Sequence, residues 1–228
     1  MLIAKRSKVV FIGDSITDCS RVRPIGEGRE NALGSGYVAL VNAIVEATCP
    51  SADLRIVNMG VGGDTSRELK WRWKSDALDL RPDWISVMIG INDVWRRFHH
   101  RRNVTEDQVS LEEYEDTLDE LVASANAAGI KVLLLSPFVI EENASDRMRL
   151  LTAAFGEAAK RVSARRGAMF VDIQRVFDRY LLDSYPSELS ADRVHPNLTG
   201  HMLIARAWLA AVGFEPEPFS MKEGNTAL

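Results

Sequence analysis

The chain has 228 residues, of which 46% are hydrophobic and 26% charged, a balance that fits one soluble globular core and excludes a disordered or fibrous chain. The net charge of -4 and the pI of about 5.7 give no overall electrostatic attraction to nucleic acid or anionic lipid. No run approaches the roughly 20 apolar residues of a membrane-spanning helix, so we expect neither a nucleic-acid partner nor a membrane.

Five short apolar runs predict the strands of a sheet that is buried on both faces. They are Lys8–Gly13, Leu54–Asn58, Trp84–Ile89, Lys131–Ser136 and Ala168–Asp172. The segments between them have helical period and helix length. This alternation predicts an α/β fold, a three-layer α/β/α sandwich with a five-stranded parallel sheet. Active sites in such folds form beyond the carboxyl ends of the strands.

Helix ends are marked by capping residues and glycines. A helix over 110–128 opens with Ser110 and Glu113 as a capping box, and a second covers 146–166 before Gly167. The last helix is predicted from about Pro196, in its first turn, to Val212. We expect one domain over residues 1–214 and a loosely held polar tail over 215–228.

The first candidate site residue is Ser15, because the first strand ends at Gly13 and places this hydroxyl at the carboxyl edge. Taken alone, Asp14 and Ser15 could equally cap the next helix. After the second strand comes a glycine-rich turn over 58–66, in which Gly63 could present its N–H to an oxyanion or a phosphate. A tight turn into a helix capped by Asp64 or Thr65 is the alternative.

Two further sites follow later strands. Asn92 follows the third strand, where its carboxamide could donate to an oxyanion or could form an Asx-turn. Asp192 stands three residues before His195, close enough to orient the imidazole as a base for a serine. Together these positions supply the nucleophile, oxyanion donors, base and orienting acid of an acyl-transfer site. No metal or cofactor is needed for that chemistry.

Four segments of the chain resemble the four motif blocks of the SGNH/GDSL serine hydrolases. They are Gly13-Asp-Ser-Ile, Gly63 within Asn-x-Gly-x-x-Gly-Asp-Thr, Gly90-x-Asn92 and Asp192-x-x-His195. The resemblance spans residues 8 to 212 and implies the flavodoxin-like hydrolase fold. It also implies Ser15 as nucleophile, His195 as base, Asp192 as acid, and an oxyanion hole made by the Ser15 and Gly63 N–H groups with Asn92.

A narrower resemblance is to the intracellular acetylxylan esterases of this superfamily. It rests on the segments 11–19, 34–38, 88–96 and 192–196. It implies removal of acetyl groups from O-acetylated sugars such as xylo-oligosaccharides. Two alternatives stay open: a lysophospholipase- or thioesterase-type acyl hydrolase on the same scaffold, and a non-catalytic phosphate- or nucleotide-binding module. The Arg-, Gly- and Asp-rich loops after Ser15 and Asn92 favour a small polar substrate.

Some features fall outside this site. Trp95, three residues after Asn92, is the tryptophan placed to contact a sugar. The basic run over 96–102 fits a solvated or subunit-contact surface, and exposed aromatic and basic loops are compatible with homo-oligomers. The N-terminus carries no secretory signal, so we expect a cytoplasmic protein with Cys19 and Cys49 reduced.

Overall fold

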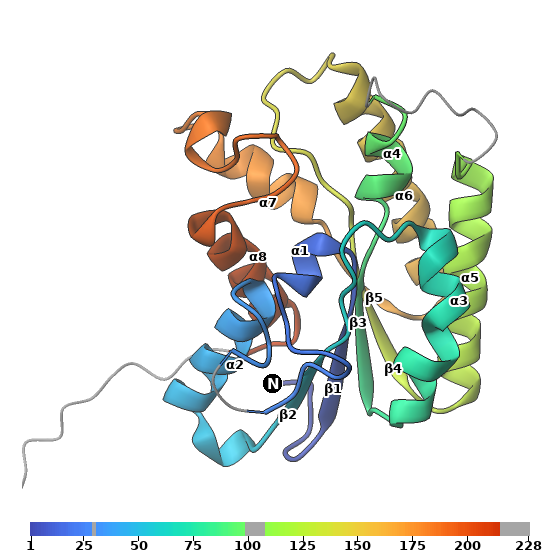
Figure 1. Cartoon of the computed structure of the whole chain (residues 1–228), viewed down its shortest axis with the longest axis vertical. Helices are drawn as coiled ribbons and strands as arrows, with labels where there is room; N and C mark the ends of the chain where they lie inside the picture. Colours follow the sequence, from blue (N-terminus) through green and yellow to red (C-terminus); the bar gives the residue numbers. More distant parts are fainter. Residues whose placement is uncertain (29–30, 99–107, 215–228) are drawn as a thin grey trace, which may run out of the picture.

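The computed structural model describes residues 1–28, 31–98 and 108–214, and its elements form three layers (Figure 1). The five strands pair in parallel in the order β2-β1-β3-β4-β5. They are β1 (Lys8–Gly13), β2 (Arg55–Asn58), β3 (Trp84–Met88), β4 (Lys131–Leu135) and β5 (Met169–Val171). The predicted five-stranded parallel sheet is confirmed, with strand ends that differ by at most one residue. Every residue of β3 is buried, as its continuous apolar run predicts.

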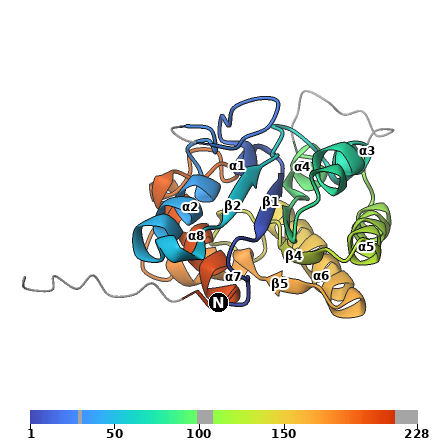
Figure 2. The same cartoon turned by 90° about the horizontal axis from the view of Figure 1, so that it is seen from below.

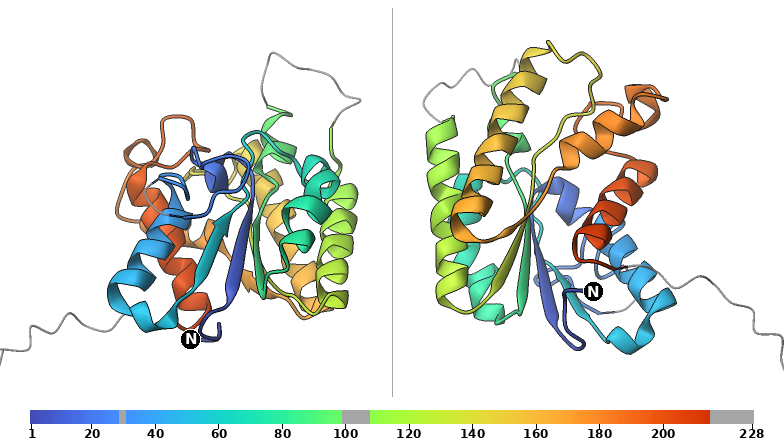
Figure 3. Two further views of the ribbon diagram at one scale, coloured as in Figure 1. Left: turned by 60° about the horizontal axis from the view of Figure 1, so that its bottom comes forward. Right: turned by 180° about the vertical axis from the view of Figure 1, so that it is seen from behind.

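Two helical layers cover the sheet, as Figures 2 and 3 show. One layer contains α3 (Ser66–Asp76), α5 (Leu111–Ala127) and α6 (Arg147–Arg166). The other contains α2 (Tyr37–Thr48), α7 (Ile173–Tyr180) and α8 (Leu198–Ala211). The short helices α1 (Ser15–Asp18) and α4 (Ile91–Trp95) lie at the carboxyl ends of β1 and β3.

The strand order places a topological switch point between β1 and β3. From β1 the chain moves outward to β2, then crosses back past β1 to β3 on the other face. The connections after β1 and β3 therefore leave on opposite faces and open a crevice at the carboxyl edge. Residues that follow these two strands meet in that crevice.

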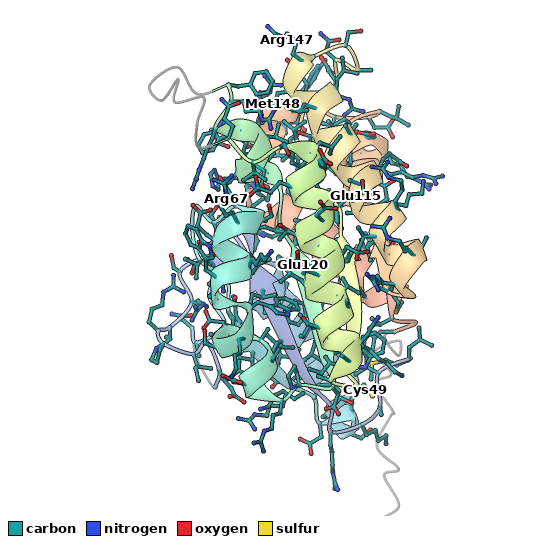
Figure 4. The ribbon with its side chains drawn as sticks, turned by 90° about the vertical axis from the view of Figure 1, so that its right-hand side faces the viewer. Cys49, Arg67, Glu115, Glu120, Arg147 and Met148 are labelled. Atoms are coloured by element: carbon teal, nitrogen blue, oxygen red, sulfur yellow. The ribbon has the colours of Figure 1, made fainter. Side chains whose placement is uncertain are left out.

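Helix α5 corrects one prediction. Ser110 caps the helix by accepting the Glu113 N–H at 3.0 Å, but the second half of the expected capping box is missing. The Glu113 carboxylate instead accepts two hydrogen bonds from Arg67 of α3, at 2.7 and 2.8 Å. A charged guanidinium outcompetes a backbone N–H for this carboxylate because the charge-assisted pair is the stronger bond. Figure 4 shows Arg67 on the side of the molecule where α3 and α5 lie next to each other.

Helix α8 corrects a second prediction, the one for its first residue. The helix starts at Leu198, and Asn197 is its N-cap, whose side chain accepts the Gly200 N–H at 3.2 Å. Pro196 therefore precedes the helix and does not lie in its first turn, which leaves the segment before it as a loop. Trp208 anchors the helix on the sheet by packing on Phe11 at 5.0 Å between ring centroids. The expected tail over 215–228 and residues 99–102 of the basic run lie outside the described residues.

Candidate active site

Ser15, His195 and Asp192 form one hydrogen-bonded chain at the carboxyl edge of the sheet. The Ser15 Oγ lies 2.8 Å from the His195 Nε2, and the His195 Nδ1 lies 2.6 Å from an Asp192 carboxylate oxygen. A carboxylate beside Nδ1 keeps the proton on that nitrogen, which leaves Nε2 free to accept the serine proton. The three residues predicted to act together do lie together.

Tight backbone packing fixes the position of Ser15. A Cβ on Gly13 would lie 2.1 Å from the Met88 carbonyl oxygen, so only glycine lets β1 end so close to β3. Asp14 then caps α1 by accepting the Ile16 N–H at 3.0 Å. The two readings of this segment are therefore compatible, because Asp14 supplies the cap and Ser15 the exposed hydroxyl. Burial raises the pKa of the Asp14 carboxyl to about 7, so below that pH this side chain is mostly neutral and places little negative charge next to Ser15.

The loop before α8 orients His195. One Asp192 oxygen accepts the backbone N–H groups of Val194 and His195, at 3.0 and 2.8 Å, while the other faces the ring. Burial acts to raise the pKa of Asp192, but these hydrogen bonds outweigh it and hold the pKa at about 2. Arg193 has a φ of +71°, and its ion pair with Asp146 at 2.7 Å ties this turn to the start of α6. Asp192 therefore stays ionised beside the imidazole.

The glycine-rich turn leaves one backbone donor free. Within the part of the chain that the structure describes, every N–H from residue 60 to residue 66 has an acceptor except that of Gly63. The acceptors are side-chain oxygens of Asn58, Asp18, Glu68 and Asp93 and the carbonyl oxygens of Gly13 and Val61. Gly63 has a φ of +88°, and a Cβ there would meet nothing within 4 Å. The Gly63 N–H has no acceptor among the described residues, so it is available to a substrate oxyanion.

Two more donors complete this arrangement. Asn92 is buried and uses one of its two amide hydrogens to bond the Asp64 carbonyl oxygen at 2.9 Å, which leaves the other available. The Ser15 N–H, at the start of α1, has no acceptor among the described residues. The alternative reading of the turn also holds, since Thr65 caps α3 in a capping box with Glu68.

A cleft of about 460 Å³ opens beside the triad. It is lined by Ser15, Ile16, Cys19, Ser35, His195, Pro196, Leu198 and His201. This size falls within the range of small-molecule sites, and the lining mixes hydroxyl, thiol, imidazole and aliphatic groups. Trp95 does not line this cleft but contacts His195, with the two ring centroids 6.0 Å apart and the planes at 82°. Both cysteines are free thiols.

Sequence reasoning missed the residues that hold the glycine-rich turn. Asp18 accepts the Gly62 N–H at 3.0 Å, and Arg23 pairs with Asp18 at 2.6 Å. Asn58 donates to the Thr17 carbonyl oxygen at 2.7 Å and so ties the end of β2 to α1. Asp18 lies in the segment 11–19 that carries the resemblance to the acetylxylan esterases, but nothing in its spacing indicates a partner 44 residues away.

Two other kinds of site are absent from the described ranges. Residues 1–28, 31–98 and 108–214 contain no group of three or more His, Cys, Asp or Glu side chains arranged to hold a metal ion. The helices within the same ranges include none that is long and apolar enough to span a membrane.

Comparison with known proteins places this geometry in context. The model of the GDSL-like lipase/acylhydrolase family matches residues 11–203. The acetylxylan esterase of Geobacillus stearothermophilus is 46% identical over 94% of this chain and 98% of its own length. The crystal structure of that enzyme, Axe2, superposes with a TM-score of 0.92 over the same shares of the two chains. Its structures also include catalytic mutants in which a serine, an aspartate or a histidine is replaced by alanine. LAE5, an alpha/beta hydrolase from the metagenome of Lake Arreo, is 50% identical over 93% of this chain and 98% of its own, with a TM-score of 0.90.

Proposed function

The chain belongs to the GDSL-like lipase/acylhydrolase family, and we propose that within it the chain removes acetyl groups from O-acetylated xylo-oligosaccharides through an acetyl-enzyme on Ser15. It is a carboxylic ester hydrolase. One observation carries the reaction: the continuous contact from Ser15 through His195 to Asp192, at 2.8 and 2.6 Å. A phosphate-binding module has no use for such a chain of acid, base and nucleophile.

In the proposed mechanism, His195 Nε2 takes the Ser15 proton as Oγ attacks the ester carbonyl carbon. Charge then develops on the carbonyl oxygen, and the N–H groups of Ser15, Gly63 and Asn92 stabilise it. His195 returns the proton to the departing sugar oxygen, which leaves an acetyl group on Ser15. The same imidazole then deprotonates a water molecule that attacks the acetyl carbonyl carbon, and it returns the proton to Ser15 Oγ as acetate leaves. Asp192 stabilises the imidazolium formed in each half-reaction.

The sugar substrate is supported by the relatives and by the cleft. Acetylxylan esterase is the printed activity of the 46% identical relative, which this chain matches along nearly its full length. We propose that Trp95, whose ring stands beside His195, contacts the sugar. The open, mixed polar lining suits a small polar alcohol better than a long acyl chain.

We also propose a cytoplasmic location and self-association for this protein. The free state of both thiols supports a cytoplasmic location. Large exposed apolar side chains, Leu182 at 81% and Trp71 at 75%, support self-association.

Acetate release from acetylated xylo-oligosaccharides tests the substrate proposal. It is compared with hydrolysis of octanoyl esters and of acyl-CoA, and the Ser15→Ala variant serves as the control. We expect the acetylated sugar to have the highest kcat/KM and the variant to lose activity by about 10⁴-fold or more. Faster turnover of the octanoyl ester would favour a lipase-type enzyme and refute the sugar assignment.

A further inference from the structure

The ion pair between Asp18 and Arg23 lies against the glycine-rich turn, next to the nucleophile. Asp18 Oδ2 accepts the Gly62 N–H at 3.0 Å and an Arg23 N–H at 2.6 Å. A second Arg23 nitrogen donates to the Gly60 carbonyl oxygen at 2.9 Å. The pair thus holds two peptide groups of the turn, one through its N–H and one through its carbonyl.

These contacts fix the peptide groups on either side of the one that carries the free donor. A Cβ on Gly60 would lie only 2.3 Å from the Asp18 nitrogen, so the turn packs backbone to backbone against α1. Asp18 holds the turn just before Gly63, and Arg96 holds it just after by donating to the Gly63 carbonyl oxygen at 2.6 Å. Gly63 has the conformational freedom of glycine, so its N–H direction depends on these anchors.

The anchor brings a charge close to the reacting atoms. Asp18 Oδ2 and the Ser15 Cβ both lie within 4 Å of the position that a Gly62 Cβ would take, at 3.6 and 3.9 Å. The Asp18 side chain is only 12% exposed, so water screens it poorly. An uncompensated carboxylate here would oppose the negative charge that develops on the substrate oxygen. The Arg23 guanidinium, 2.6 Å away, supplies the compensating charge.

We propose that Asp18 and Arg23 are positioning residues for the oxyanion hole: Asp18 aims the Gly63 N–H by holding Gly62, and Arg23 cancels the charge that this anchor introduces. The inference rests on the proposed acyl-transfer function. It gives the two residues separable roles, since a neutral amide can still accept the Gly62 N–H without bringing a charge.

A double-mutant cycle tests the proposal. Arg23→Gln, Asp18→Asn and the double variant are assayed for kcat and KM with p-nitrophenyl acetate. Arg23→Gln should lower kcat by about tenfold with KM little changed, because the exposed Asp18 charge raises the energy of the transition state. Adding Asp18→Asn should restore most of this loss, because it removes the opposing charge and retains an acceptor for Gly62.

The matched control is Arg166→Gln. It breaks an ion pair with Asp119 whose side chains are 39% and 18% exposed, close to the 50% and 12% of Arg23 and Asp18. This control should leave kcat at the native value. A loss in Arg23→Gln that Asp18→Asn does not relieve, or a lower Tm with unchanged kcat, would overturn the proposal. If Arg23→Gln does not fold, Arg23→Lys takes its place: it keeps the charge and should retain native kcat, and a tenfold loss there would overturn the proposal too.

The positioning role of Asp18 and Arg23 can fail independently of the proposed function. Failure of native protein to deacetylate xylo-oligosaccharides would refute the sugar assignment, yet the cycle on p-nitrophenyl acetate would still report on Asp18 and Arg23. Failure of a fluorophosphonate to label Ser15 would refute the acyl-transfer function itself, whatever the cycle shows.

Discussion

His195 and His201 lie six residues apart, and the fold gives them different environments. His195 is exposed and lies in hydrogen-bond contact with Asp192 and Ser15. His201 is 6% exposed; its Nδ1 accepts the Tyr37 N–H at 3.2 Å, and its Nε2 lies 3.3 Å from the Cys19 Sγ. Burial lowers the pKa of His201 to about 4, so this ring stays neutral where His195 works. Only one of the two imidazoles is free to act as a base.

The lowered pKa of His201 predicts that this residue makes the stability of the fold depend on pH. The folded pKa of His201, about 4, lies below its ordinary value of 6.5, so between these values the unfolded chain binds a proton that the folded chain does not. His201 therefore destabilises the fold as pH falls through this window. His201→Asn keeps an acceptor for the Tyr37 N–H but cannot titrate. In urea unfolding at about pH 7.5 and 4.5, the native protein should lose more stability than the variant. Equal losses in the two proteins would contradict this account of His201.

Sequence reasoning identified the reacting residues better than the residues that hold them. Ser15, Asn92 and His195 follow strands or precede a helix, so local pattern was enough to place them at one edge. Asp18 and Arg23 act through contacts with Gly62 and Gly60, and such contacts exist only once β1 and β2 are paired. No local spacing encodes a pairing of that kind.

At the scale of elements, the apolar runs predicted each strand of the described sheet, and the signal was most continuous where burial is complete, as in β3. Helix termini were harder where partners from another element compete. Glu113 bonds Arg67 of α3 and not the start of its own helix, and the first turn of α8 begins two residues after Pro196. A helix after Asp14 was one of the two interpretations of that segment, but the four-residue α1 carries too little periodicity for its end to be predicted.

Different packing around Gly60, in the contact between α1 and the glycine-rich turn, and around Gly156, in α6, predicts opposite effects on stability when each is replaced by alanine. Gly60→Ala would place its Cβ 2.3 Å from the Asp18 nitrogen, where only backbone movement could relieve the clash. We therefore expect the free energy of unfolding to fall by about 3 kcal/mol and esterase activity to be lost. In Gly156→Ala, inside α6, the new Cβ would meet only the Ser136 Cβ at 3.5 Å. Because alanine favours a helix more than glycine does, the free energy of unfolding should rise by about 0.5–1 kcal/mol. Urea unfolding measures both. A Gly60→Ala protein of native stability and activity would show that the turn is not packed as described.

The molecule as a whole brings together groups that are far apart in the sequence. Ser15 and His195 are separated by 180 residues and meet because α8 returns to pack beside β1. The strand order directs the segments after β1, β2 and β3 to the same crevice. The order of the four motif blocks was therefore enough to predict a shared site, while the distances between their atoms required the fold.

Labelling with a fluorophosphonate probe tests the central claim most directly, because only a serine activated by its neighbours reacts. Peptide mass spectrometry of the folded, labelled protein should find the phosphonyl group on Ser15, with labelling greatly slowed in His195→Ala. Ser184, which is half-buried like Ser15 and bonded to Glu188, is an internal control and should stay unmodified. Folded native protein that remains unlabelled at Ser15, or that is labelled equally at Ser184, would contradict the assignment of Ser15 as the nucleophile.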